Sequence, residues 1–181
     1  MTNTNKQRRV VVTGYGSVTP MGMTAQQSWA AIMDYQLGYR YYDKSEQGIK
    51  SRFFGLLDAE PNLKSVPAAI RRRLPRYARL VLAAAKEAMG MAFAEQSPEA
   101  YYDLLDCGTI IGSGWAGQDE THDNYEGYLA TGLGTPFGCF LSMPNAGTAA
   151  CSLYWGLRGY QNSPIAACAT GTIAIGDAFE I

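Results

Sequence analysis

The sequence predicts an α/β fold, in which a sheet of short strands is covered by helices. Short β-branched runs that end in glycine turns predict buried strands, and apolar residues at helical spacing predict helices between them. Strands that alternate with helices imply a parallel or mixed sheet with helices packed on it. The chain has 181 residues, 47% hydrophobic and 17% charged, so residues 1–181 are expected to form one domain with a buried core.

The N-terminal third predicts one strand, one helix and a long loop. The strand is expected at residues 9–13, a β-branched run that ends at a Gly-Tyr-Gly turn. The helix follows with Thr24 as its N-cap and apolar side chains at helical spacing. Residues 37–66 are irregular and rich in glycine, proline and aromatic residues, so we expect a loop there with a short strand at 52–57.

The clearest helix is expected at residues 76–94, where apolar side chains recur every third or fourth position. Pro75 suits the first turn of this helix. Residues 107–111 predict a second buried strand that ends at a Gly-Ser-Gly turn. The polar residues 118–128 predict the start of another helix, followed by a glycine-rich loop to Gly138.

The C-terminal part predicts two helices around a short strand. A helix of small residues is expected at 145–157, with Gly159 just beyond its end. A strand is expected near residues 162–167, and residues 168–181 predict the last helix. The sequence stops within this helical pattern without a capping glycine or a proline, so we expect a fragment of a longer protein.

Composition disfavours several classes of partner. The net charge is −1, so no field of one sign predicts binding to nucleic acid or to a membrane surface. The one basic run, at 71–73, has Arg76 and Arg79 close behind it. We interpret these arginines as a solvated helix start, with a landing site for an acidic partner as the alternative.

The targeting and metal signals are weak. Residues 1–9 are polar and lack the apolar stretch of a signal peptide, and no apolar run approaches the roughly 20 residues that span a bilayer. We therefore expect a cytoplasmic protein with reduced thiols. The four cysteines show no metal-ligand spacing, so no zinc site and no cofactor are expected.

Cys168 is the candidate nucleophile. It lies where an apolar strand is expected to turn into a helix, among the small residues Ala166, Ala167, Ala169 and Gly171. A thiol at this position meets the positive end of the helix dipole and unpaired backbone N–H groups, and both favour the thiolate. The same strand–turn–helix geometry displays the nucleophile of hydrolases. A buried structural cysteine is the alternative, which position alone leaves open.

The other reactive side chains have weaker settings. Cys107 opens a strand, Cys139 lies in a loop, and Cys151 lies on a helix of small residues. We expect each of these cysteines to pack rather than to react. His122, the single histidine, lies in a polar run and is expected at the surface rather than as a catalytic base.

Two glycine turns raise the alternative of a dinucleotide-binding oxidoreductase. Residues 14–16 lack the third glycine of a GxGxxG motif, where Thr19 stands. Residues 112–117 match the motif, but bulky Trp115 and the two carboxylates that closely follow Gly117 oppose a bound pyrophosphate. We therefore disfavour nucleotide binding, which titration with a nicotinamide cofactor would test.

Several segments together resemble the condensing enzymes, the β-ketoacyl-carrier-protein synthases of the thiolase-like fold. They occur in family order at family-like spacing over nearly the whole chain, and the set is more specific than any one motif. The segments are residues 9–22, 83–88, 111–114, 143–145, 156–159 and 167–178. The resemblance implies the N-terminal half of a layered αβαβα architecture and a homodimer joined along the strand before the cysteine.

The resemblance also implies the chemistry. Cys168 would accept an acyl group from an acyl carrier protein or coenzyme A, and a malonyl-carrier-protein would then lose CO₂ and attack the thioester. The backbone N–H of Cys168 would supply half of an oxyanion hole. Two histidines, a lysine and the second oxyanion donor belong to the family's C-terminal half. We therefore expect this chain alone to permit acylation but not decarboxylation, within fatty acid or polyketide-type elongation.

Three positions depart from the family pattern. Tyr160 replaces a proline, and Pro164 lies within the predicted interface strand, where the missing N–H would weaken or shift strand pairing. Trp115 replaces a smaller side chain at the gate of the acyl pocket, so we expect a shortened pocket that disfavours long acyl chains. Because this family binds its acidic carrier protein through arginine-rich surfaces, the resemblance makes residues 71–79 a stronger candidate for the surface that contacts the carrier protein.

The main alternative is a non-catalytic ketosynthase-like partner subunit or an inactive truncated fragment. Partners of this kind generally lack the nucleophile, so the presence of Cys168 favours the enzyme. The missing histidines favour the alternative for this chain by itself.

Overall fold

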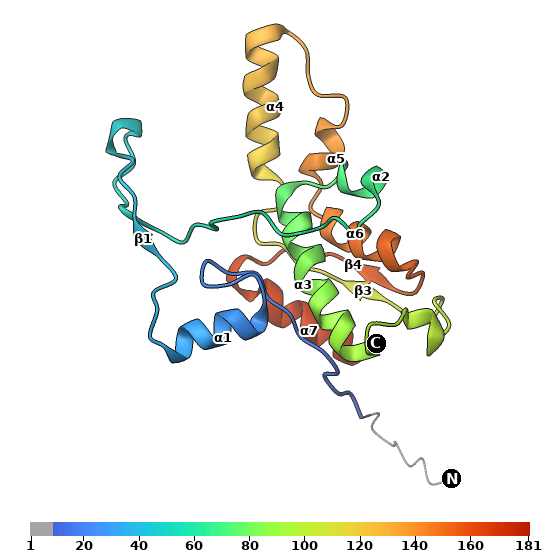
Figure 1. The fold of residues 1–181 in the computed structure, drawn as a ribbon. Helices are drawn as coiled ribbons and strands as arrows, with labels where there is room; N and C mark the ends of the chain where they lie inside the picture. The colour runs from blue at the N-terminus through green and yellow to red at the C-terminus, as the bar shows by residue number, and fades with distance from the viewer. Residues whose placement is uncertain (1–8) are drawn as a thin grey trace, which may run out of the picture.

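The structure is a computed structural model that describes residues 9–181 (Figure 1). The α-helices are α1 Ala25–Met33, α2 Ala68–Arg71, α3 Arg76–Phe93, α4 Gln118–Thr131, α5 Gly138–Ser142, α6 Ala146–Trp155 and α7 Thr170–Glu180. The strands are β1 Arg40–Tyr41, β2 Phe53–Phe54, β3 Thr109–Ile110 and β4 Gln161–Asn162. Short 3₁₀ helices span η1 Ser45–Gln47, η2 Pro98–Ala100 and η3 Ala167–Ala169. The mixture of helix and strand confirms the predicted α/β class.

The core lies where α3 and α6 pack together. Leu82 of α3 is fully buried, and it lies in one cluster with Cys151 of α6. Leu63 and Val66 complete this cluster from the segment that crosses α3 on its way to α2 (Figure 1). The stripe of apolar side chains predicted on residues 76–94 is therefore the face that builds the core.

β3 and β4 form a parallel pair, and β4 leads to the segment that contains Cys168. Thr109 of β3 lies opposite Gln161 of β4. Both α6 and α7 contact β3. The buried hydroxyl of Thr148, on α6, lies 3.3 Å from the carbonyl oxygen of Ile111 and 3.2 Å from that of Asn162, so one side chain ties together the ends of both strands.

The strand predicted at residues 9–13 does not form, so that prediction is wrong. Its side chains are largely exposed, Val12 at 86%, and within residues 9–181 no strand pairs with this run. A β-branched run needs a neighbouring strand to bond its backbone groups, and none lies beside this run in the described chain; residues 14–16, directly after it, pack against α3. Gly14 and Gly16 make this approach possible, because an added Cβ would lie 2.1 Å from the carbonyl oxygens of Ala88 and Ala84 respectively.

The remaining elements match the prediction in position but not always in length. Thr24 caps α1 as predicted, accepting a hydrogen bond from the N–H of Gln27 at 3.1 Å. The strand expected at 107–111 shortens to β3, and the strand expected near 162–167 is replaced by β4, which begins at Gln161 and overlaps the expected range only at Asn162. The loop expected to lead to Gly138 is partly helical, because α4 continues to Thr131 and α5 begins at Gly138 itself.

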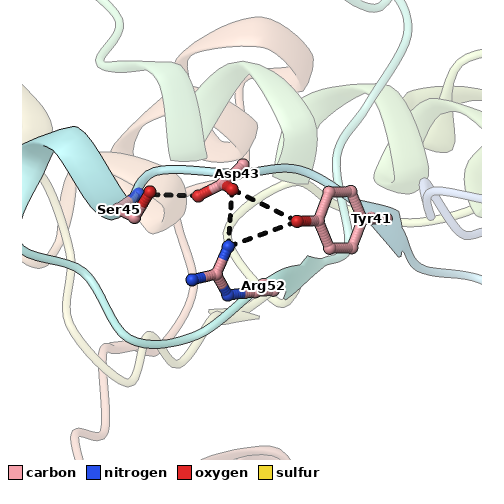
Figure 2. Close-up of polar contacts among 4 residues, drawn as sticks. All are labelled: Tyr41, Asp43, Ser45 and Arg52. Atoms are coloured by element: carbon pink, nitrogen blue, oxygen red, sulfur yellow. Dashed lines mark hydrogen bonds and ion pairs between the residues drawn. The ribbon is translucent and has the colours of Figure 1, made fainter.

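The strand expected at 52–57 is β2, which forms an antiparallel hairpin with β1. In the hairpin loop, the carboxylate of Asp43 accepts hydrogen bonds from the N–H of Ser45 at 2.8 Å and the hydroxyl of Tyr41 at 3.2 Å (Figure 2). The same carboxylate forms an ion pair with Arg52 at 2.5 Å. Asp43 therefore holds both arms of the hairpin, which projects from the body of the molecule (Figure 1).

Within the described residues, 9–181, no helix is both long and apolar enough to span a membrane. The same part of the chain contains no cluster of three or more His, Cys, Asp or Glu side chains suited to a metal ion.

Candidate active site around Cys168

Cys168 lies in a tight turn between β4 and α7. It occupies the middle of η3, which passes directly into α7 at Thr170. The N–H of Ala166 donates to the hydroxyl of Thr170 at 2.9 Å, and the N–H of Ala169 donates to the carbonyl of Ala166 at 3.0 Å. These bonds close the turn around the cysteine, as the predicted strand–turn–helix arrangement requires.

The residue before the cysteine has an unusual backbone. Ala167 has φ +48°, in the left-handed region that side chains other than glycine rarely adopt. Strained backbone of this kind concentrates at functional sites, where the surrounding structure holds it in place. Here it lies directly before Cys168, which is exposed to solvent.

The electrostatic setting of Cys168 follows from α7. The first turn of this helix contains no acidic side chain, so no carboxylate there offsets the positive end of the helix dipole. Gly171, in the same turn, has open space around its Cα. Asn162 of β4 donates to the carboxylate of Asp177 at 2.9 Å, which fixes α7 against the strand that leads to the cysteine.

The loop after β3 lies against the cysteine turn. The N–H of Ser113 donates to the carbonyl of Pro164 at 3.3 Å. A Cβ added to Gly112 would lie 2.1 Å from Cγ2 of Thr170, and one added to Gly114 would lie 3.7 Å from the carbonyl oxygen of Ala167. The structure thus brings together residues 112–114 and the turn of Cys168, although Gly114 and Cys168 are 54 positions apart in the chain.

Trp115 follows directly on this loop. Its side chain is 76% exposed. The next residue, Ala116, has φ +57°, and its N–H donates to the hydroxyl of Ser113 at 2.7 Å, so the backbone that carries the indole is itself held in a tight turn. Trp115 therefore lies one residue from the contact with the Cys168 turn, and its role as an acyl-pocket gate stays a prediction.

The other cysteines differ in environment. Cys151 is buried in the core, and burial raises the pKa of its thiol to about 12. Cys107 is half-buried, and burial followed by the nearby carboxylates of Asp106 and Asp103 raises its pKa. Packing is thus confirmed for Cys151 and in part for Cys107. Cys139 is exposed on α5, so the prediction that it packs is wrong.

His122 lies on the exposed part of α4. Its side chain is 69% exposed and forms an i,i+4 pair with Glu126 at 3.1 Å. The predicted surface position is confirmed. α4 projects away from the body of the molecule (Figure 1), so His122 lies on a part of the helix that is exposed to solvent.

The GxGxxG segment is explained by packing. A Cβ on Gly117 would lie 2.0 Å from the carbonyl oxygen of Leu141, so this glycine is required where α4 begins against α5. Asp119 and Glu120 occupy the first turn of α4. Glu120 accepts the backbone N–H of Arg76 and so caps the start of α3. Close packing against Leu141 therefore accounts for Gly117, and the hydrogen bond to the start of α3 accounts for Glu120.

The five arginines of residues 71–79 are distributed over α2, the segment after it and α3. Arg71 ends α2, and α3 starts at Arg76 after Pro75. Arg72 and Arg73 are exposed, as a solvated helix start predicts, whereas Arg71 and the two later arginines are half-buried. Arg73 lies over the ring of Phe137 at 5.7 Å.

Comparison with known proteins identifies the group to which the chain is related. Residues 7–181 match the profile of the Beta-ketoacyl synthase, N-terminal domain. The chain belongs to the β-ketoacyl synthase family. Two relatives, each a 3-oxoacyl-[acyl-carrier-protein] synthase 2, are those of Synechocystis sp., 30% identical over 97% of this chain, and of Rhizobium meliloti, 29% identical over 96%. The chain spans 42% and 43% of these two relatives, which is less than half of each.

Solved structures show the fold of this β-ketoacyl synthase domain. A β-ketoacyl synthase from Burkholderia phymatum matches with TM-score 0.77 at 23% identity, over 96% of this chain and 43% of that one. A type II polyketide acyl-carrier protein in complex with its ketosynthase matches with TM-score 0.77 at 20% identity, over 96% of this chain and 46% of that one. The predicted thiolase-like architecture, present here as the N-terminal half, is confirmed.

Proposed function

We propose that the protein to which this domain belongs is a β-ketoacyl-[acyl-carrier-protein] synthase that carries its acyl intermediate on Cys168. The observation that carries the proposal is the exposed thiol in the strained turn between β4 and α7, at the start of a helix without first-turn carboxylates. Family membership supports the same residue, because the segment around Cys168 resembles the one expected to carry the nucleophile in this family.

The reaction has two steps. In the first, the Cys168 thiolate attacks the carbonyl carbon of an acyl thioester, the C–S bond to the carrier breaks, and the carrier leaves as a thiolate that takes up the proton lost by the cysteine. In the second, the malonyl thioester loses CO₂, its α-carbon attacks the acyl carbonyl, and the Cys168 thiolate leaves as the β-ketoacyl product forms. The backbone N–H of Cys168 is the proposed donor to the oxyanion in both steps.

The groups that assist decarboxylation are expected outside this chain. His122 is exposed and paired with Glu126, on a helix that projects from the body. The family's two histidines and lysine are expected in the remainder of the full-length enzyme, of which relatives contain more than twice this length. Acylation of Cys168 is therefore the partial reaction expected of residues 1–181 alone.

An acyl carrier protein is the proposed donor of both substrates. One structural neighbour is an acyl-carrier protein in complex with its ketosynthase. On this chain, exposed Arg72 and Arg73 at the α2–α3 junction supply positive charge for an acidic partner. The cytoplasmic location expected from the sequence stays a prediction.

A homodimer is proposed through the strand before the cysteine. Among residues 9–181, β4 pairs with β3 alone, so its second edge has no partner strand. Ile165, just after β4, is 55% exposed. Pro164 provides no N–H for a partner strand, so the pairing would be short on its C-terminal side.

The proposed restriction of acyl-chain length concerns Trp115. Its exposed indole follows the loop that contacts the Cys168 turn, where it would narrow the approach of a long chain. Competition between short and long acyl donors on the full-length enzyme, with Trp115→Ala beside wild type, tests this. Equal use of both chain lengths by wild type would refute the restriction.

The first test of the function is intact-mass analysis after reaction with an epoxide electrophile directed at ketosynthases, such as cerulenin. We expect one adduct on wild type and none on Cys168→Ala. Cys139→Ala is the matched control, because that thiol is also exposed but lies on α5, and its adduct should equal that of wild type. An adduct that persists in Cys168→Ala would contradict the assignment.

A further inference from the structure

A basic groove lies beside the start of α3, formed with the segment that precedes α2. Its volume is about 520 Å³. Lys64, Arg71, Arg72 and Arg79 line it, together with one carboxylate, that of Glu60. The groove is open to solvent on one side and lies in a part of the surface that neither Cys168 nor Trp115 lines.

The positive charge of this groove is not neutralised by the protein. Glu60 forms an ion pair with Nε of Arg76 at 2.8 Å, so the one carboxylate already has a cation that is not among the lining residues. Across the described part of the chain, no ion pair involves any of the four lining cations. Like charges gathered without a counter-charge repel one another, which favours a bound anion.

Arg71 is held in place, and Arg79 has a buried donor without a partner within residues 9–181. Nη1 of Arg71 donates to the carbonyl oxygen of Leu63 at 3.3 Å, which fixes this guanidinium against the groove wall. Nε of Arg79 is buried and has no hydrogen-bond partner within residues 9–181. A buried donor without an acceptor is unfavourable, so the protein itself leaves this side chain uncompensated.

We propose that this groove binds a phosphate group, as part of a soluble phosphate ester. The guanidinium fork matches the oxygens of a phosphate in a bidentate manner, and it does so better than a lysine ammonium. Three guanidinium groups, those of Arg71, Arg72 and Arg79, line one concave groove, and this arrangement favours a compact oxyanion as its occupant. The inference depends on the groove itself and not on the reaction proposed at Cys168.

Isothermal titration of the purified chain with inorganic pyrophosphate, at constant ionic strength, tests the proposal. We expect saturable binding with one site per chain. Arg72→Gln and Arg79→Met should each weaken it about tenfold, the effect of losing one charge-assisted hydrogen bond. Arg73→Gln is the matched control, because this arginine is close in sequence but lies over Phe137 and does not line the groove.

The outcomes separate the possibilities. Unchanged binding in Arg73→Gln and in Cys168→Ala would support a distinct phosphate site. Loss of binding to the same extent in Arg73→Gln would show only general attraction by positive charge, and would overturn the proposal. Equal affinity for citrate at matched charge, or no saturable binding of pyrophosphate, would also overturn it. Because Arg72 is exposed, its variant remains informative even if Arg79→Met does not fold.

Discussion

Gly112 and Thr170 are in direct contact, and the contact leaves no room for a side chain on the glycine. A Cβ at Gly112 would lie 2.1 Å from Cγ2 of Thr170 and 3.0 Å from the carbonyl oxygen of Pro164. Thr170 is buried, starts α7, and accepts the N–H of Ala166. The loop after β3 therefore sets the position of the turn that displays Cys168.

Gly112→Ala should disturb both stability and the nucleophile. Overpacking against Thr170 is expected to lower the free energy of unfolding by about 1–3 kcal/mol, because the methyl group must displace a buried side chain. The rate of Cys168 alkylation should change as the turn shifts. Urea unfolding and timed alkylation measure the two effects.

Gly176→Ala is the control for this variant, because Gly176 lies on α7 with nothing within 4 Å of an added Cβ. It should be neutral or stabilising by up to about 1 kcal/mol, since alanine favours the helix. Equal stability of Gly112→Ala and wild type would show that the loop and the turn can separate without cost.

The four thiols should differ in their reaction with a small alkylating agent. In the native state at neutral pH, we expect the exposed Cys139 and Cys168 to react first and half-buried Cys107 more slowly. Cys151 should react only after unfolding, because burial raises its pKa to about 12 and keeps the thiol protonated. Peptide mapping after timed alkylation gives the order. Early modification of Cys151 would contradict the described core.

Local sequence signals predicted the elements whose contacts lie within one helix. Thr24 caps α1 and Pro75 precedes α3 because both effects depend on neighbouring residues alone. The turn at Cys168 was predictable for a similar reason, since an apolar run, small residues and a helical pattern adjoin in the sequence.

Elements that depend on distant partners were not predictable in this way. The run at residues 9–13 has the composition of a strand but no strand beside it in the described chain. The contact of Gly112 with Thr170 arises from residues far apart in the sequence. No local sequence pattern indicates a contact of this kind, so the packing of the loop after β3 against the Cys168 turn could be found only from the structure.

The Asp43 carboxylate should make the β1–β2 hairpin sensitive to acid. Hydrogen bonds from Ser45 lower the pKa of Asp43 the most, and Tyr41 and Arg52 lower it further, from its ordinary value of 3.8. A pKa lowered by folding stabilises the folded hairpin above the unfolded pKa, and this contribution is lost as the pH falls below 3.8 through the folded pKa. The chemical shift of the Ser45 amide, titrated against pH, should report a midpoint below 3.8.

Variants separate the causes of this shift. Ser45→Ala should raise the midpoint of Asp43 more than Arg52→Gln does, because Ser45 contributes the largest effect. Asp58→Asn is the control: Asp58, which lies after β2, forms an ion pair with Arg40 of β1 at 2.5 Å and is not among the groups that lower the pKa of Asp43. A midpoint at or above 3.8 in wild type would refute the network shown in Figure 2.

Glu87 joins the N-terminal segment to the core helix. Its carboxylate, on α3, accepts the N–H of Ser17 at 3.0 Å and the N–H of Ala25 at 2.9 Å. Ala25 is the first residue of α1, so a side chain from another helix supplies an acceptor that the helix start needs. The carboxylate of Glu87 therefore holds residues 17–25 against α3.

Glu87→Ala should lower the free energy of unfolding by about 1–3 kcal/mol, because it leaves two backbone donors without their acceptor. Glu87→Gln keeps one acceptor oxygen and should lose less. Glu99→Gln, an exposed glutamate, should match wild type in urea unfolding. Limited proteolysis adds a local readout, since residues 17–25 should be cut faster in Glu87→Ala than in either other variant. A global loss of stability without faster cleavage there would show that Glu87 acts through α3 rather than by holding this segment.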